Sequence, residues 1–211
     1  MWPLRGRMEI NMKNIITIQH TQSVHHTNGM VGSWTDSELT DLGKAQAENI
    51  GRKLSAELKG QAYKIYSSDL IRAKQTAQPL ADYLNIPINF NQKLREQNLG
   101  EAVGKTGSWA RENEMPIKSF DDRQFYGAES WREFWNRVSD LYDDVVSDEA
   151  DNIILVSHGV TLSVWQQVWQ GSDICEFKYS GYPGGISFFQ ISPSGERSIL
   201  RLHDPSYIES D

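Results

Sequence analysis

The chain has 211 residues, of which 38% are hydrophobic and 23% charged, a composition typical of a globular protein with one generous domain or two small ones. Its formal net charge of −7 at pH 7 argues against a nucleic-acid partner and against binding to an anionic membrane surface. A single cysteine, Cys175, excludes a disulfide framework and favours a reducing, cytoplasmic location, and no apolar stretch is long enough to cross a membrane.

The N-terminal segment 1–12 contains neither the long apolar region nor the small-residue cleavage site of a signal peptide. We therefore expect residues 1–12 to be a poorly ordered extension. No internal repeat and no shift in composition divides the remainder, so residues 13–211 are predicted to form a single domain.

A buried strand is predicted at residues 14–19, where an apolar run leads directly into His20. Residues 153–157 repeat this arrangement near the other end of the chain and lead into His158. Because the carboxyl ends of parallel strands meet at one edge of a sheet, we expect the two histidines to lie in one site. Imidazole in such a place can act as a nucleophile, an acid or base, a metal ligand or an oxyanion donor.

Helices and short strands alternate in the region that follows. Thr40 is a suitable cap for a helix that ends before Gly60, and a short strand is predicted at 63–66. The next helix carries Arg72 in its first turn, and Pro79 inside it predicts a kink or an early end. A further short strand is expected at 86–90.

The segment 95–128 is long and of mixed polarity, which is typical of lids and binding loops. We expect a short helix around Trp109 there and this side chain to be the aromatic residue that touches a substrate. Ser130 then starts a strongly amphipathic helix whose aromatic stripe is predicted to be core. Strands at 186–191 and 198–202 flank a turn and predict an antiparallel hairpin.

Strands that alternate with helices and end in a hairpin predict an α/β fold, a three-layer α/β/α sandwich around a mostly parallel mixed sheet. Polar segments would fall together at one edge of that sheet. Arg72 has a planar fork suited to phosphate or carboxylate, and the start of its helix supplies free amides nearby. Glu96 places a carboxylate at the mouth of the long segment.

In their order along the chain these segments resemble the motifs of the histidine phosphatase superfamily, the group that includes cofactor-dependent phosphoglycerate mutase. The family is marked by Arg-His-Gly-Glu/Gln-Ser/Thr after a strand, Ser-Ser-x-Leu-x-Arg-Ala-x-x-Thr-Ala, Leu-x-Glu-x-x-x-Gly and a late Ser-His-Gly. The corresponding segments here begin at Gln19, Ser67, Leu94 and Ser157. The resemblance implies a phosphoglycerate mutase-like fold, with residues 13–211 as one catalytic domain.

The resemblance also implies roles for individual residues. His20 would be the nucleophile that forms a phosphohistidine, and Glu96 the general acid that protonates the leaving oxygen. Arg72 and His158 would hold the phosphoryl oxygens during transfer. The further phosphate contacts expected from the motifs are Gln19, Ser23, His26 and Gly159. In phosphoryl transfer the protein mainly positions the reactants and supplies positive charge around the phosphoryl oxygens. We expect no metal or cofactor here.

Two residues beside the predicted nucleophile depart from the family pattern. Gln19 stands where the family has arginine, and Thr21 where it has glycine. Charge-assisted hydrogen bonds are about twice as strong as neutral ones, so we expect weaker phosphate affinity or slower turnover. His26, where the family often has a phosphate-contacting asparagine, could offset this loss if protonated, as could His25 or Lys105. Adjacent side chains of an extended segment point apart, so we expect His25 at the surface.

The leading prediction is a metal-independent phosphatase acting on a small phosphorylated metabolite, as a monomer or a homodimer. A phosphoglycerate mutase remains an alternative, although the segment between Gly100 and Glu129 is short for enclosing a doubly phosphorylated intermediate. A non-enzymatic phospho-ligand binding module would result if Gln19 abolished turnover. A metal hydrolase is a further alternative, since imidazole and carboxylate suit zinc or manganese. Its ligands would be His20, His25, His26 and Asp36.

Overall fold

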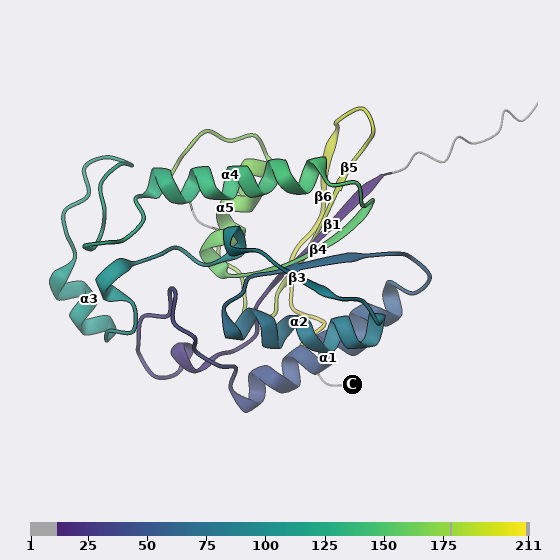
Figure 1. The fold of residues 1–211 in the computed structure, drawn as a ribbon, viewed down its shortest axis with the longest axis horizontal. Helices are drawn as coiled ribbons and strands as arrows, with labels where there is room; N and C mark the ends of the chain where they lie inside the picture. The colour runs from purple at the N-terminus through teal and green to yellow at the C-terminus, as the bar shows by residue number, and fades with distance from the viewer. Residues whose placement is uncertain (1–11, 178, 210–211) are drawn as a thin grey trace, which may run out of the picture.

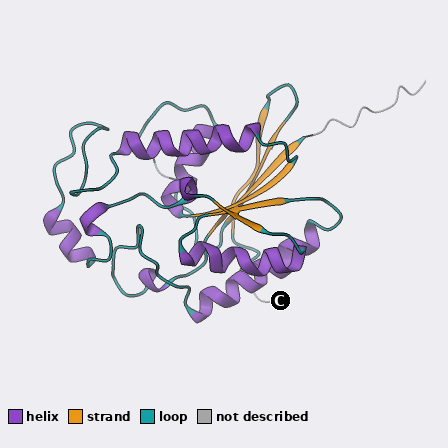
Figure 2. Cartoon of the chain, in the orientation of Figure 1, coloured by secondary structure: helices purple, strands orange, loops and turns teal. Residues whose placement is uncertain are grey.

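The computed structural model describes residues 12–177 and 179–209. Apart from Met12, the predicted N-terminal extension lies outside the described residues. A six-stranded sheet runs through the molecule with helices on both of its faces (Figures 1 and 2). This is the three-layer α/β/α arrangement predicted from the sequence.

The sheet is mixed and mostly parallel, as predicted. Its strands are β1 (Lys13–Gln19), β2 (Lys64–Ser67), β3 (Ile88–Phe90), β4 (Asn152–Ser157), β5 (Ile186–Ile191) and β6 (Arg197–Asp204). They lie in the order β3-β2-β4-β1-β5-β6. The first four are parallel, whereas β5 runs antiparallel to both β1 and β6. Strands β1 and β4, which end at the two histidines, are neighbours at the centre of the sheet.

Helices cover both faces of the sheet, as Figure 1 shows. Helices α1 (Asp41–Glu57) and α2 (Ile71–Leu84) pack on one face, and α4 (Trp131–Ser147) and α5 (Gly159–Trp169) on the other. The predicted short helix around Trp109 is α3 (Gly107–Asn113). Single 3-10 turns are η1 (Val24–His26), η2 (Gln92–Leu94) and η3 (Gly100–Ala102). Among the described residues, no helix is both long and apolar enough to span a membrane.

The central strands are mostly apolar between their ends, in keeping with the burial of both of their faces. Ile16 and Ile18 of β1 point into the core shared with α1 and α2, whereas Ile15 points into the core shared with α4 and α5. Successive strand residues point to opposite faces, and so a strand covered on both faces is apolar at most consecutive positions. Burying each such side chain contributes roughly 1.5–3 kcal/mol, which fixes the register of the two strands that carry the histidines.

Two helix starts follow the predicted caps. The Thr40 hydroxyl accepts the Gly43 amide at 3.0 Å, and Ser130 forms a capping box with Glu133. The prediction that the helix could end early at Pro79 is wrong, because α2 continues to Leu84. Pro79 packs closely against Gly51 of α1, where an added Cβ would approach the Pro79 backbone to 2.9 Å. This close helix packing is a tertiary contribution that favours the helix despite the hydrogen bond that proline removes.

Candidate active site

The two strand-end histidines meet at the carboxyl edge of the sheet. Gln19 of β1 is in register with Ser157 of β4, and the His20 amide donates to the Ser157 carbonyl at 2.8 Å. The rings of His20 and His158 lie 5.0 Å apart between centroids, at an angle of 61°. The structure thus brings together two residues that are far apart in sequence.

The hydrogen bonds of His20 fix which of its ring nitrogens is free. Nδ1 lies 2.8 Å from the Thr21 carbonyl oxygen, which can only accept, so Nδ1 carries the proton. In the neutral ring Nε2 then presents a lone pair, and it accepts from Nε of Arg72 at 3.3 Å. Burial, and secondly the Arg72 charge, hold the pKa of His20 well below its usual 6.5. A neutral imidazole with its Nε2 lone pair available is a competent nucleophile.

Arg72 is a buried and oriented cation, with only 1% of its surface exposed. Its Nη1 donates to the Thr35 carbonyl at 2.7 Å and its Nη2 to the Ser33 carbonyl at 2.6 Å. Burial lowers the pKa of the guanidinium to about 10, so it remains charged at neutral pH. The loop before α1 therefore aims a fixed positive group at Nε2 of His20.

The Glu96 carboxylate lies at the start of α5. Its Oε2 accepts the Val160 amide at 3.1 Å, and its Oε1 accepts the Thr161 amide and hydroxyl, each at 3.1 Å. The partial positive charge of a helix N-terminus favours an anion in this position. The Glu96 carbonyl in turn accepts from Nε1 of Trp34 at 2.7 Å and from Nη2 of Arg137 at 3.1 Å. Both contacts fix the backbone of the loop, and no sequence pattern singles out Arg137.

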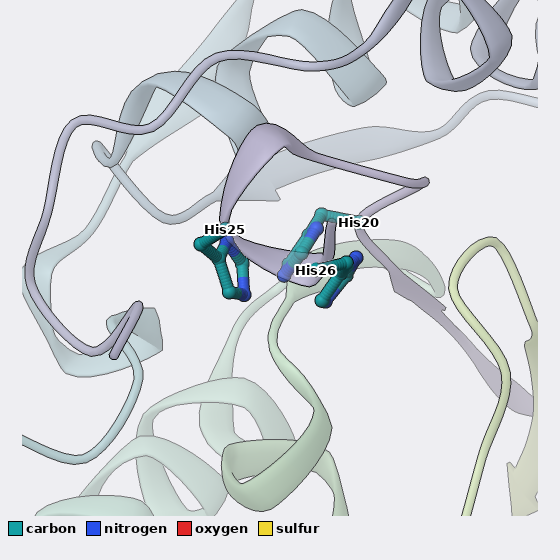
Figure 3. A group of neighbouring side chains, drawn as sticks. All are labelled: His20, His25 and His26. Atoms are coloured by element: carbon teal, nitrogen blue, oxygen red, sulfur yellow. The ribbon is translucent and has the colours of Figure 1, made fainter. Parts of the chain in front are cut away.

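A short turn brings two further histidines to His20, and Figure 3 shows the three rings gathered together. The ring of His25 lies 5.7 Å from that of His20, and the ring of His26 stacks on it at 5.2 Å. The prediction that His25 lies at the surface is wrong, because η1 is a 3-10 turn rather than extended chain. The Val24 amide donates to the Glu38 carbonyl at 2.9 Å, a contact with a distant segment that helps to hold the turn.

Ser23 and His158 contact the group formed by His20, His25 and His26 from the protein interior. The Ser23 amide donates to Nδ1 of His26 at 3.2 Å, and its hydroxyl is 2.7 Å from Nδ1 of His25. Ser23 thus supports both rings. His158 is fully buried, with Nε2 2.9 Å from the Ser68 hydroxyl, while its Nδ1 has no hydrogen-bond partner. Direct phosphate contacts by Ser23 and His158 stay predictions.

A cavity of about 260 Å³, the histidine pocket, opens over these groups. Its lining consists of Gln19, His20, His25, His26, Ser33, Arg72, Glu96, Gly159, Val160, Ser163, Tyr179 and Ser180. Among these described residues, Arg72 is the only arginine or lysine, so it supplies the fixed positive charge. The contributions of Tyr179 and Ser180 could not be foreseen, because the loop between α5 and β5 contains no recognisable motif.

Gln19 lines the pocket at the position where the family has arginine. It sits beside the start of α5, where a Cβ on Gly159 would come within 3.3 Å of the Gln19 Nε2. The glycine thus leaves room for the Gln19 amide, which can donate a hydrogen bond but adds no charge. The loss of the family arginine is therefore a real loss of positive charge at this wall.

Three other residues singled out by the sequence lie away from the pocket lining. Trp109 stacks on Phe125, with centroids 6.2 Å apart, and packs in a small separate cluster, so its expected contact with substrate is not supported. The Lys105 ammonium lies 5.7 Å from the centre of the Trp109 ring. Asp36 is exposed, and its Oδ1 accepts the Ile71 amide at 3.3 Å instead of joining the three histidines. The four-ligand metal site of the alternative prediction is therefore not assembled.

Comparison with known proteins places this geometry in a family. The model of the histidine phosphatase superfamily (branch 1) matches residues 15–204. The chain belongs to this superfamily. A relative from Hydrogenobacter thermophilus, provisionally named phosphoserine phosphatase 2, is 33% identical over 199 residues, which cover 90% of this chain and 94% of the relative.

Further similarities agree with this membership of the histidine phosphatase superfamily. The glucosyl-3-phosphoglycerate phosphatase of Mycolicibacterium vanbaalenii is 26% identical over an alignment that covers 87% of this chain and 85% of that relative. The crystal structure of phosphoglycerate mutase from Bacillus anthracis superposes with a TM-score of 0.76 at 22% identity, and the match covers 95% of this chain and 96% of the mutase chain. The predicted phosphoglycerate mutase-like fold is thereby confirmed.

Proposed function

We propose that this protein hydrolyses a small phosphomonoester through a phosphohistidine on Nε2 of His20, without a metal ion. Its family and the names of its relatives support the general activity, that of a histidine-type phosphatase. The observation that carries the specific mechanism is the state of His20, which is neutral, protonated on Nδ1 and beside a buried arginine.

In the first step Nε2 of His20 attacks phosphorus, and the bond from phosphorus to the ester oxygen breaks. Glu96, protonated for this step although its contacts with the start of α5 favour the carboxylate, gives its proton to that leaving oxygen, so the alcohol departs neutral. The Thr21 carbonyl accepts from the Nδ1–H and stabilises the cationic ring that forms. Arg72 and the Gln19 amide contact the equatorial oxygens, where charge must be balanced in phosphoryl transfer.

In the second step water attacks the phosphorus of the phosphohistidine. Glu96, now a carboxylate, accepts a proton from the water, and the bond between phosphorus and Nε2 breaks. Inorganic phosphate leaves and His20 returns to its neutral form. The covalent intermediate replaces one difficult displacement with two easier ones.

Hydrolysis is favoured over mutase activity by the charge next to the histidine pocket. A second cavity of about 320 Å³, here called the acidic pocket, is lined in part by Gln97, the residue after Glu96. Four carboxylates line it: Glu114, Asp122, Glu129 and Glu176. Glu129 is paired with Arg137 at 2.8 Å, but Glu114, Asp122 and Glu176 would repel the second phosphate of a doubly phosphorylated intermediate that reached this cavity.

We further propose that residues 13–211 act as one catalytic domain in the reducing cytoplasm, as a monomer or homodimer. A metabolite panel that includes phosphoserine, glucosyl-3-phosphoglycerate and 3-phosphoglycerate tests the function, with phosphate release and isomer formation followed in parallel. We expect phosphate release that is lost in His20→Ala. Isomer formation without phosphate release would overturn the choice of hydrolysis, and phosphate binding without turnover would indicate a binding module.

A further inference from the structure

We propose that His20, His25 and His26 form a site for a transition-metal ion such as Zn²⁺, and that an ion bound there switches the phosphatase off. The part concerning inhibition rests on the proposed function. The site is distinct from a metalloenzyme centre, because the ion takes the nucleophilic atom instead of activating water.

The geometry of the three rings suits a small cation. One ring nitrogen from each histidine lies within 4.8 Å of a ring nitrogen of both others. Zinc–imidazole bonds of about 2.0–2.1 Å in tetrahedral geometry place their nitrogens ~3.4 Å apart. The ring nitrogens must therefore approach one another by up to about 1.4 Å, a modest change for His25 and His26, which lie on a turn of three residues where His26 is exposed.

Two of the rings already have the outer hydrogen bonds that a metal ligand needs. A ligating histidine holds its other ring N–H in a hydrogen bond, which fixes the tautomer. In His20 the Thr21 carbonyl accepts from Nδ1–H, which leaves Nε2 for the ion. In His25 the Ser23 hydroxyl, 2.7 Å from Nδ1, can accept in the same way.

His26 is the weaker third ligand. Its Nδ1 accepts the Ser23 amide at 3.2 Å, so in the neutral ring the proton sits on Nε2. To bind the ion through Nε2, His26 must move that proton to Nδ1 and give up this long hydrogen bond. The ion thus replaces one weak contact by one coordinate bond.

Arg72 makes the site reversible. Its Nε lies 3.3 Å from Nε2 of His20, so an incoming cation displaces this contact and remains near a like charge. The exposed Asp36 carboxylate, bonded to the Ile71 amide, does not join the group to offset that repulsion. We therefore infer an inhibitory ion in exchange with solution, and not a resident one.

The consequence for catalysis follows from the shared atom. An ion on Nε2 of His20 occupies the lone pair that would form the bond to phosphorus. Metal binding and phosphohistidine formation therefore exclude one another. Regulation of the proposed phosphatase would then follow the availability of free zinc.

The test separates binding from activity. Calorimetric titration of the tag-free protein with Zn²⁺, and the visible absorption of Co²⁺ at the same site, report binding without any substrate. We expect one ion per chain, with affinity reduced about tenfold or more in His25→Asn and in His26→Asn. His203→Asn is the matched control, because His203 lies outside the cluster and its φ of 51° suits asparagine.

Release of p-nitrophenol measured at each Zn²⁺ concentration supplies the second readout. We expect inhibition that follows the binding curve and is reversed by a chelator. Equal affinity in the wild type and in both cluster variants would overturn the site, and full activity with the site occupied would overturn its inhibitory role. A protein that binds Zn²⁺ as predicted but is inactive in chelator would contradict the proposed function alone.

Discussion

The Nε of Arg72 and the Nε2 of His20 lie 3.3 Å apart, although 52 positions separate the two residues in the sequence. This contact joins the buried cation of the site to the atom that would attack phosphorus. Burial, and secondly the charge of Arg72, lower the pKa of His20 and so keep a second proton off Nε2. Each of the following predictions depends on this pair or on a group that surrounds it.

Arg72→Lys should lower kcat/KM about 10²–10³-fold, because lysine cannot hold two carbonyls and a phosphoryl oxygen with one planar fork. Steady-state hydrolysis of p-nitrophenyl phosphate checks this. Arg111→Lys, a change at an exposed arginine of α3, is the matched control. Circular dichroism must show that the variant is folded. A loss no larger than that of the control would show that Arg72 does not bind the phosphoryl group.

Glu96→Gln should lower kcat about 10²–10⁴-fold for an alkyl phosphate, whose leaving oxygen needs a proton. For p-nitrophenyl phosphate the rate of phosphohistidine formation should decrease much less, because nitrophenolate leaves without taking up a proton. Burst kinetics on both substrates measure the difference. Glu101→Gln, at the exposed neighbouring carboxylate, serves as the control. Equal losses on the two substrates would contradict the role of Glu96 as general acid.

Gln19→Arg should restore the family's cation to the pocket wall. A charge-assisted contact in place of a neutral one adds roughly 1 kcal/mol, which corresponds to about fivefold tighter substrate binding. The KM for a phosphomonoester is the quantity to measure. Gln78→Arg adds the same charge on an exposed position of α2 and controls for net charge. An unchanged KM would contradict the conclusion that the missing arginine weakens phosphate binding at this wall.

Acidification should destabilise the fold partly through His25. Burial, and secondly His26 and Arg72, lower the pKa of His25 to about 3, whereas the unfolded chain titrates near 6.5. The unfolded state therefore binds more protons, and stability declines as the pH falls from about 6.5 towards 3. Urea unfolding across this range should show a smaller decline in His25→Asn than in the wild type. Parallel declines in the two proteins would contradict the lowered pKa.

Much of the fold could be predicted from local patterns. The mostly apolar runs before His20 and His158 indicated doubly covered strands, and the capping residues Thr40 and Ser130 marked two helix starts. These features are set by neighbouring residues, so periodicity reveals them. The helix that continues past Pro79 could not be predicted, since it depends on packing against Gly51 of another helix.

The candidate site could be predicted only for residues that lie next to the ends of predicted helices and strands. His20, Arg72 and Glu96 meet as expected, because strand ends and helix starts share one edge of the sheet. His25 was misplaced because its turn is held by contacts with the distant residues Ser37 and Glu38. The positioning contact of Arg137 with the Glu96 carbonyl comes from the polar side of an amphipathic helix, where the sequence offers no signal.

The central claim is that phosphate passes through His20, and rapid quenching during turnover tests it most directly. Protein mixed with labelled substrate, quenched in base and digested should yield one phosphopeptide that contains residue 20. The label should be stable in base and lost in acid, as expected for a phosphohistidine, and it should be absent in His20→Ala. A His20→Ala variant that retains the wild-type rate, or a label on another residue, would contradict the proposed mechanism.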